Sequence, residues 1–178
     1  MNFLPTRAIL TAVVTAMSAA YANAQQFQAT LAGFNETPST LFSPGQGTLT
    51  LLLDRQLQTL NYTLTYSNLP TQVLQAHIHF GQVHLTGGVM VFFCTNLGNG
   101  PVGTPLCPQS GTLTGQIIAS SVIGPAAQGI PAGSFDALVA ALLSNSAYGN
   151  VHTQQFPGGE IRGQITIIAP PAFPGRGG

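Results

Sequence analysis

Alternation of apolar and polar residues constrains this chain more than any other feature of its sequence. The pattern is cleanest at 60–66, where the order is Leu-Asn-Tyr-Thr-Leu-Thr-Tyr. A period of two places every second side chain on one face of a β-strand, so this segment predicts a strand with one buried face. Comparable runs, rich in threonine and β-branched residues and separated by Gly and Pro clusters, lie at 26–31, 47–54, 73–80, 88–93, 111–119 and 159–168.

The connections between these runs point to a fold class. The polar stretch 54–59 predicts a hairpin between 47–54 and 60–66. One segment departs from the strand pattern: after Ser134, a candidate N-cap, apolar residues recur at helical spacing at Phe135, Leu138, Val139 and Leu142. Together these signals predict an all-β fold, an antiparallel Greek-key-like sandwich or barrel with one short helix.

The two ends of the chain differ from its middle. We expect residues 1–24 to be a signal peptide, because one charge, Arg7, precedes a mostly apolar run at 8–20 and an A-x-A cleavage signal at 22–24. The domain would then cover 25–169, and the Pro/Gly-rich tail 170–178 is expected to be disordered. No later segment reaches the ~18 consecutive apolar residues of a membrane-spanning helix. The sequence therefore predicts a secreted protein, extracellular or periplasmic.

Charged side chains are rare, with four Lys+Arg, all of them arginine, and four Asp+Glu. Such a surface has no electrostatic footprint for nucleic acid or anionic lipid. A hydrolase is poorly supported too, because acids are few and no G-x-S-x-G elbow occurs.

Cys94 and Cys107 are the only two cysteines. In an exported chain such a pair is expected to form a disulfide, and its spacing is unlike that of a C-x-x-C redox site. Closing the Gly/Pro-rich loop between the two cysteines would stabilise the fold by roughly 2–3 kcal/mol.

Two of the four histidines, His77 and His79, stand at i and i+2 in the strand predicted at 73–80. Their imidazoles would share one face of that strand, as a pair of metal ligands does. His152, which precedes a Gly-rich turn, is a candidate third member. Three imidazoles suit copper or zinc, but the spacing equally suits a hydrogen-bonded structural cluster, which is the simpler interpretation.

Glu160 and Arg162 also stand at i and i+2. An ion pair, or a hydrogen-bonded bracket for a loop, is the simpler interpretation of this spacing. The sharper hypothesis is that Arg162 guides a small anion electrostatically.

Three segments resemble the CHRD domain family, named after chordin, an extracellular antagonist of bone morphogenetic proteins. They are Ala-His-Ile-His-Phe-Gly at 76–81, Tyr-Gly-Asn-Val-His-Thr at 148–153 and Pro-Gly-Gly-Glu-Ile-Arg-Gly-Gln at 157–164. The resemblance extends over nearly all of the mature chain and implies a stand-alone secreted β-rich domain of the bacterial type. It carries no defined activity, and it maps the recurring histidines of the family onto His77, His79 and His152, leaving His84 aside.

A weaker resemblance is to Cu/Zn superoxide dismutase, which has H-x-H on a strand of a Greek-key barrel and an arginine near its copper. His77, His79, Phe80, Gly81 and Arg162 fit that sketch, whereas the zinc-loop histidines and aspartate of that family have no clear counterparts.

Two functional hypotheses follow. The first is a non-catalytic extracellular or envelope module that binds an unidentified partner, with a structural or metal-stabilised histidine cluster. The alternative is a copper-binding, superoxide-dismutase-like redox protein that uses His77, His79 and His152, with Arg162 steering an anion.

Overall fold

The computed structural model describes residues 24–168. The expected tail at 170–178 and all but the last residue of the expected signal peptide lie outside this range. The described elements are β1 (Ala24–Ala32), η1 (Gly33–Asn35), β2 (Gln46–Asp54), β3 (Thr59–Ser67), β4 (Val73–Phe80), β5 (Val89–Thr95), β6 (Gly111–Ile117), η2 (Ala119–Ser121), η3 (Ala126–Gln128), α2 (Phe135–Leu143), β7 (Ala147–Thr153), β8 (Ile161–Gln164) and β9 (Thr166–Ile168).

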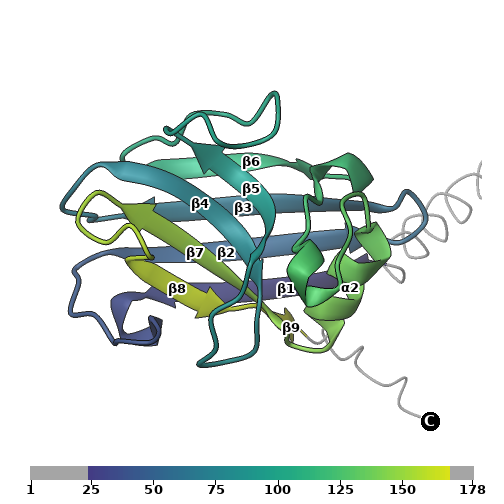
Figure 1. The fold of residues 1–178 in the computed structure, drawn as a ribbon, viewed down its shortest axis with the longest axis horizontal. Coiled ribbons are helices and arrows are strands. Elements are labelled where there is room, and N and C mark those ends of the chain that lie inside the picture. Colours follow the sequence, from purple (N-terminus) through teal and green to yellow (C-terminus); the bar gives the residue numbers. More distant parts are fainter. Residues whose placement is uncertain (1–23, 169–178) are drawn as a thin grey trace, which may run out of the picture.

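The strands form one antiparallel sheet in the order β5-β4-β7-β8-β1-β2-β3-β6, with β9 paired to β1. The expected hairpin joins β2 to β3, with Leu49 opposite Leu64. The sheet nearly closes into a barrel: Figure 1 shows β4, β7 and β8 as one layer over β1, β2 and β3. Tyr62 of β3 meets Phe93 of β5 across the interior, with ring centroids 4.8 Å apart. The predicted all-β antiparallel sandwich or barrel with one short helix is thus confirmed.

The core follows from the alternation in β1, β2 and β3. In β2, Leu49, Leu51 and Leu53 are buried, whereas Thr48 and Thr50 are exposed. Each leucine side chain taken out of water in this way contributes about 1.5–3 kcal/mol to folding before entropy is counted. The outer face of this layer carries threonines, which tolerate water and favour extended backbone.

Strands β4, β7 and β8 differ because both of their faces are buried. Ala76, Ile78, Val151 and Ile161 belong to the hydrophobic core. Since side chains alternate, the neighbouring polar residues point to the outer face of the sheet. Three connections, 33–45, 81–88 and 154–160, cover that outer face. A buried polar layer therefore lies between the sheet and these connections, and it holds the histidines.

The disulfide between Cys94 and Cys107 is confirmed, with a Cα–Cα distance of 5.0 Å. It ties β5 to the connection that leads into β6, and these two strands end the sheet order on opposite sides. Side-chain hydrogen bonds hold this Gly/Pro-rich connection in place. The Asn96 side chain donates to Val73 O and Cys107 O, and it accepts from Cys107 N.

The structure corrects several expected boundaries. β7 was not among the predicted strands, because both of its faces are buried and its sequence therefore lacks alternation. The run predicted at 159–168 is two strands, β8 paired with β7 and β9 paired with β1, broken at Ile165. The strand predicted at 111–119 ends at Ile117.

Helix α2 forms where the apolar spacing predicted it, at the end of the barrel seen on the right of Figure 1. Phe135, Leu138 and Leu142 are buried, and Val139 packs against the core. Ser134 stands at the N-cap position but makes no side-chain capping hydrogen bond. Among the helices of residues 24–168, none is long and apolar enough to cross a membrane.

Candidate metal centre

Three imidazoles converge on the outer face of β4 and β7. His77 and His79 come from β4, and His152 comes from the neighbouring strand β7, where it lies opposite Gln75. One ring nitrogen from each histidine lies within 4.8 Å of the others, and no second group of three or more His, Cys, Asp or Glu in residues 24–168 has this arrangement. The structure therefore brings together the three histidines that the sequence grouped.

Two backbone carbonyls set the protonation of the rings. His79 Nδ1 lies 2.9 Å from Gly87 O, and His152 Nδ1 lies 3.0 Å from Pro157 O. A carbonyl oxygen only accepts hydrogen bonds, so both Nδ1 atoms carry the proton and both Nε2 atoms present a lone pair. His77 Nδ1 lies 3.1 Å from His152 Nε2 and therefore donates to it.

One pair of donor atoms has the spacing of two ligands on a transition metal ion, and the third donor lies within 4.8 Å of them. Two nitrogens bound to one tetrahedral zinc at about 2.0–2.1 Å are about 3.3 Å apart, close to the 3.1 Å between His77 Nδ1 and His152 Nε2. An ion bound to both atoms would replace the hydrogen bond between them, and the proton on His77 Nδ1 would move to Nε2. His79 Nε2 and His77 Nε2 are buried without a hydrogen-bond partner. Leaving such an atom unpaired costs about 1–3 kcal/mol. An ion held by His79 Nε2, His152 Nε2 and one nitrogen of His77 would satisfy the His79 atom.

Burial keeps the three imidazoles neutral. The exposed fractions of His77, His79 and His152 are 1%, 7% and 5%. Desolvation, and after it the charges of the neighbouring His152 and His79 rings, lower the pKa of His77 to about 2. Desolvation likewise lowers the pKa of His79 and of His152 to about 4 each. Neutral imidazole is the form that binds metals, so no imidazolium has to lose its charge before an ion binds at physiological pH.

Aromatic rings pack against two of the histidines. The Phe92 ring lies edge-on to His77, with centroids 4.2 Å apart. The Tyr148 ring stacks on His79 at 4.9 Å and 3°. The Tyr148 hydroxyl accepts a hydrogen bond from Gly87 N, next to the carbonyl that orients His79. These contacts hold the imidazole planes in place.

Arg162 supports the same part of the site from β8. Its guanidinium carbon lies 3.4 Å from the centroid of the Tyr148 ring. Nη2 donates to Leu85 O at 2.7 Å and to Gln82 O at 3.2 Å, and Nη1 donates to Thr37 Oγ1 at 2.6 Å. The side chain is 3% exposed and brackets loop 81–88, as the simpler interpretation expected. Its role as a guide for a small anion stays a prediction.

Two carboxylates lie in the same buried layer. The Asn150 amide, opposite His77 on β7, donates to Glu36 Oε1 at 2.7 Å. Burial raises the pKa of Glu36 to about 7, against the lowering effects of Asn150 and Arg162. Glu160 accepts from Ser43 Oγ at 2.6 Å and from Thr153 Oγ1. Glu160 and Arg162 thus have different hydrogen-bond partners.

Sequence reasoning missed Glu36, Tyr148 and Gly87. Glu36 and Gly87 lie in connections whose folding back over the sheet leaves no periodic signal. Tyr148 stands at i−2 and i−4 from Asn150 and His152, so the spacing that placed His77 with His79 would have found it had β7 been recognised.

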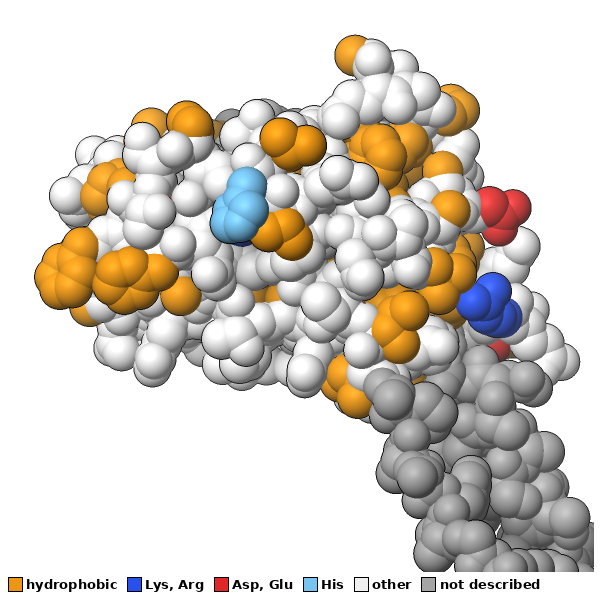
Figure 2. All heavy atoms as spheres, turned by 90° about the horizontal axis from the view of Figure 1, so that it is seen from below, with side chains coloured by type: hydrophobic (Ala, Val, Ile, Leu, Met, Phe, Trp, Pro, Cys, Tyr) orange, Lys and Arg blue, Asp and Glu red, His pale blue; other side chains and the backbone are white. Residues whose placement is uncertain are grey.

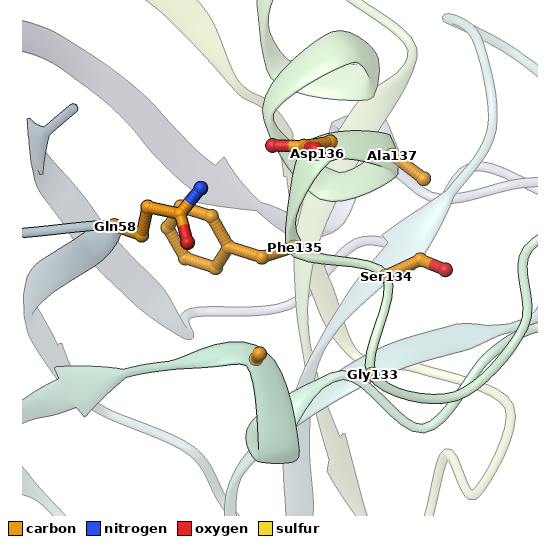
Figure 3. A pocket seen from close by; sticks show the side chains of 7 residues that line it. Gln58, Gly133, Ser134, Phe135, Asp136 and Ala137 are labelled. Carbon is orange, nitrogen blue, oxygen red and sulfur yellow. The ribbon is translucent and has the colours of Figure 1, made fainter.

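Other conspicuous residues do not join the cluster. His84 is exposed in the 81–88 loop, with a positive φ of 65°. Figure 2 shows one face of the molecule on which charges are few and hydrophobic side chains form separate groups. A hollow of about 400 Å³ lies beside the start of α2, where Gln58 and Phe135 point toward one another (Figure 3). No histidine lines it, so it is separate from the candidate metal centre.

Comparison with known proteins bears on the identity of the fold. The family model of the CHRD domain matches residues 27–165. No curated protein and no solved structure matched the chain. The matched range covers most of β1, every strand from β2 to β8 and all three clustered histidines. This chain therefore belongs to the CHRD domain family.

Proposed function

We propose that this chain is an exported CHRD module that holds one transition metal ion, copper or zinc, between His77, His79 and His152. The observation that carries the proposal is His79 Nε2, a buried atom without a hydrogen-bond partner. Its lone pair is free because the opposite nitrogen is committed to Gly87 O. A cluster that was only structural would be expected to pair this atom.

The burial of the cluster supports a binding role without catalysis. A substrate would need a route to the ion, yet all three imidazoles are nearly excluded from solvent. The ion would instead fasten β4 to β7 and stabilise the outer layer of the domain. Such a module would act by binding an extracellular or envelope partner.

Two features support export. The disulfide between Cys94 and Cys107 belongs to the class of bonds that persists in oxidising compartments. The A-x-A signal at 22–24 would place the mature terminus at Gln25, one residue after the start of β1. Intact-mass analysis of the protein secreted or released to the periplasm should give a chain that begins at Gln25.

The metal proposal is tested on that exported form. We expect one equivalent of copper or zinc by elemental analysis after loading and desalting, and none in His79→Ala. His84→Ala is the matched control, because it removes an exposed histidine outside the cluster and should keep the ion. The proposal would be contradicted if His79→Ala kept the metal, or if the wild type bound none.

A copper-dependent, superoxide-dismutase-like activity is the second candidate. One observation favours it: the Arg162 guanidinium lies against Tyr148, which stacks on His79, so a positive charge stands close to the candidate ion. A guiding role would require the buried side chain to give up hydrogen bonds to loop 81–88. Superoxide dismutation by the copper-loaded wild type, absent in His79→Ala, would support this candidate, and an inactive copper-loaded protein would refute it.

A further inference from the structure

We infer that the histidine site selects a soft monovalent cation, Cu(I), over the divalent ions Zn(II) and Cu(II). The inference rests on the proposed metal-binding function and adds to it the charge and coordination number of the ion.

The ligands themselves carry no charge. The group consists of three imidazoles, without a carboxylate or thiolate ligand. A divalent ion would therefore keep its full double charge in a buried site. The cost of moving an ion from water into a medium of low dielectric constant rises with the square of its charge, which penalises Zn(II) far more than Cu(I).

The surrounding charges balance one positive charge. Glu36, Glu160 and Arg162 are all buried in the layer that contains the histidines. A bound cation favours the ionised form of Glu36, and with both carboxylates ionised this set has one uncompensated negative charge. A monovalent ion brings the layer to neutrality, whereas a divalent ion leaves it positive.

Arg162 is the positive member of this balance. Its guanidinium contacts the ring of Tyr148, and that ring stacks on His79. The repulsion between this fixed positive charge and a bound ion doubles when the ion is divalent, as does the attraction of Glu36 and Glu160 for that ion, so Arg162 keeps the net attraction of the layer to that of one negative charge.

The number of ligands points the same way. Structural zinc sites are almost always four-coordinate, and a three-ligand zinc site completes its shell with water. Here the imidazoles are buried, so a water ligand would need a partner and space in a nearly closed site. Cu(I) forms stable three-coordinate complexes and needs no fourth ligand.

The test compares ions on the exported, disulfide-bonded protein. Ag(I) is the redox-inert probe for a soft monovalent cation, and Cu(I) is measured without oxygen against a chromophoric Cu(I) chelator. Zn(II) is measured against a zinc chelator. We expect one equivalent of Ag(I) and of Cu(I), each bound at least about 100-fold more tightly than Zn(II).

A charge variant tests the electrostatic cause. Gln75 lies opposite His152 on the same face and accepts a hydrogen bond from Asn99 through Oε1, which a glutamate can also do. Gln75→Glu should narrow the ratio of Ag(I) to Zn(II) affinity by about tenfold, since an added negative charge favours the divalent ion. Gln116→Glu, the same substitution at an exposed position on β6, should leave the ratio unchanged.

The outcomes separate the two proposals. Failure of every ion to bind the wild type would remove the proposed function itself. Zn(II) binding as tightly as Ag(I) would overturn the selectivity while leaving the metal site intact. An unchanged ratio in folded Gln75→Glu would refute the electrostatic argument.

Discussion

Replacing His79 with alanine should affect the metal-free and metal-loaded proteins very differently. In the metal-free protein the substitution removes the hydrogen bond to Gly87 O, about 0.5–1.5 kcal/mol, and the stacking on Tyr148, about 0.5–1.5 kcal/mol. It also removes the unpartnered Nε2, whose burial costs about 1–3 kcal/mol. These terms oppose one another, so we expect the free energy of unfolding to change by no more than about 2 kcal/mol.

In the metal-loaded protein the substitution also removes the stability that the bound ion contributes. An ion present at about 1,000 times its dissociation constant stabilises the folded state by about 4 kcal/mol. For a domain of this size each kcal/mol shifts Tm by about 2–4 °C, so the ion should raise the wild-type Tm by roughly 8–16 °C. His79→Ala should lose this increment, because two histidines bind the ion much more weakly than three.

The assay is thermal unfolding followed by circular dichroism, with chelator or with excess metal, for wild type, His79→Ala and His84→Ala. The exposed His84 serves as the control and should respond to metal as the wild type does. The reasoning is refuted if metal raises the Tm of His79→Ala as much as that of the wild type. A loss above about 3 kcal/mol in the metal-free variant would instead mark His79 as structural.

Three further predictions concern pH, the disulfide and the loop over the site. Burial lowers the pKa of each clustered histidine, so the stability that the neutral imidazoles give the metal-free protein is present above pH 6.5 and is lost as pH falls toward 4. Glu36 has the opposite effect: because its pKa is raised to about 7, the stability that its protonated form contributes is lost as pH rises through 7. The midpoint of urea unfolding should therefore fall between pH 7 and pH 4.5, and more steeply in Glu36→Gln; a flat profile would contradict this. Replacing Cys94 and Cys107 with serine should reduce the free energy of unfolding by about 3 kcal/mol, as expected for a 13-residue separation, and a loss under 1 kcal/mol in denaturant titrations would show that the loop is held by its hydrogen bonds alone. Arg162→Lys should speed amide hydrogen exchange in loop 81–88, because lysine cannot reach both carbonyls with a planar fork; unchanged exchange would rule out the bracket.

Much of the fold was predictable because its determinants are local. The alternation at 60–66 indicates a strand with one solvent-exposed face, and the short polar connection to 47–54 indicates a hairpin. The helical spacing from Phe135 to Leu142 likewise depends only on neighbours in sequence. β7 escaped because its residues are buried on both faces, so the period that identifies a strand is absent.

In the candidate site, too, the features that depend on local sequence were predictable and those that depend on distant contacts were not. The H-x-H spacing by itself put His77 and His79 on one face, and the presence of only two cysteines indicated the disulfide. The tertiary structure alone decided that β7 lies between β4 and β8, which brings His152 to His77 across 75 residues of sequence. Only the tertiary structure shows that three connections cover the outer face. There the Gly87 and Pro157 carbonyls decide which ring nitrogens of His79 and His152 carry a proton, and Arg162 holds loop 81–88. The physical reason is that period and spacing report which way a side chain points within its own strand. The order of strands, and what covers them, depends on contacts between residues that are distant in sequence.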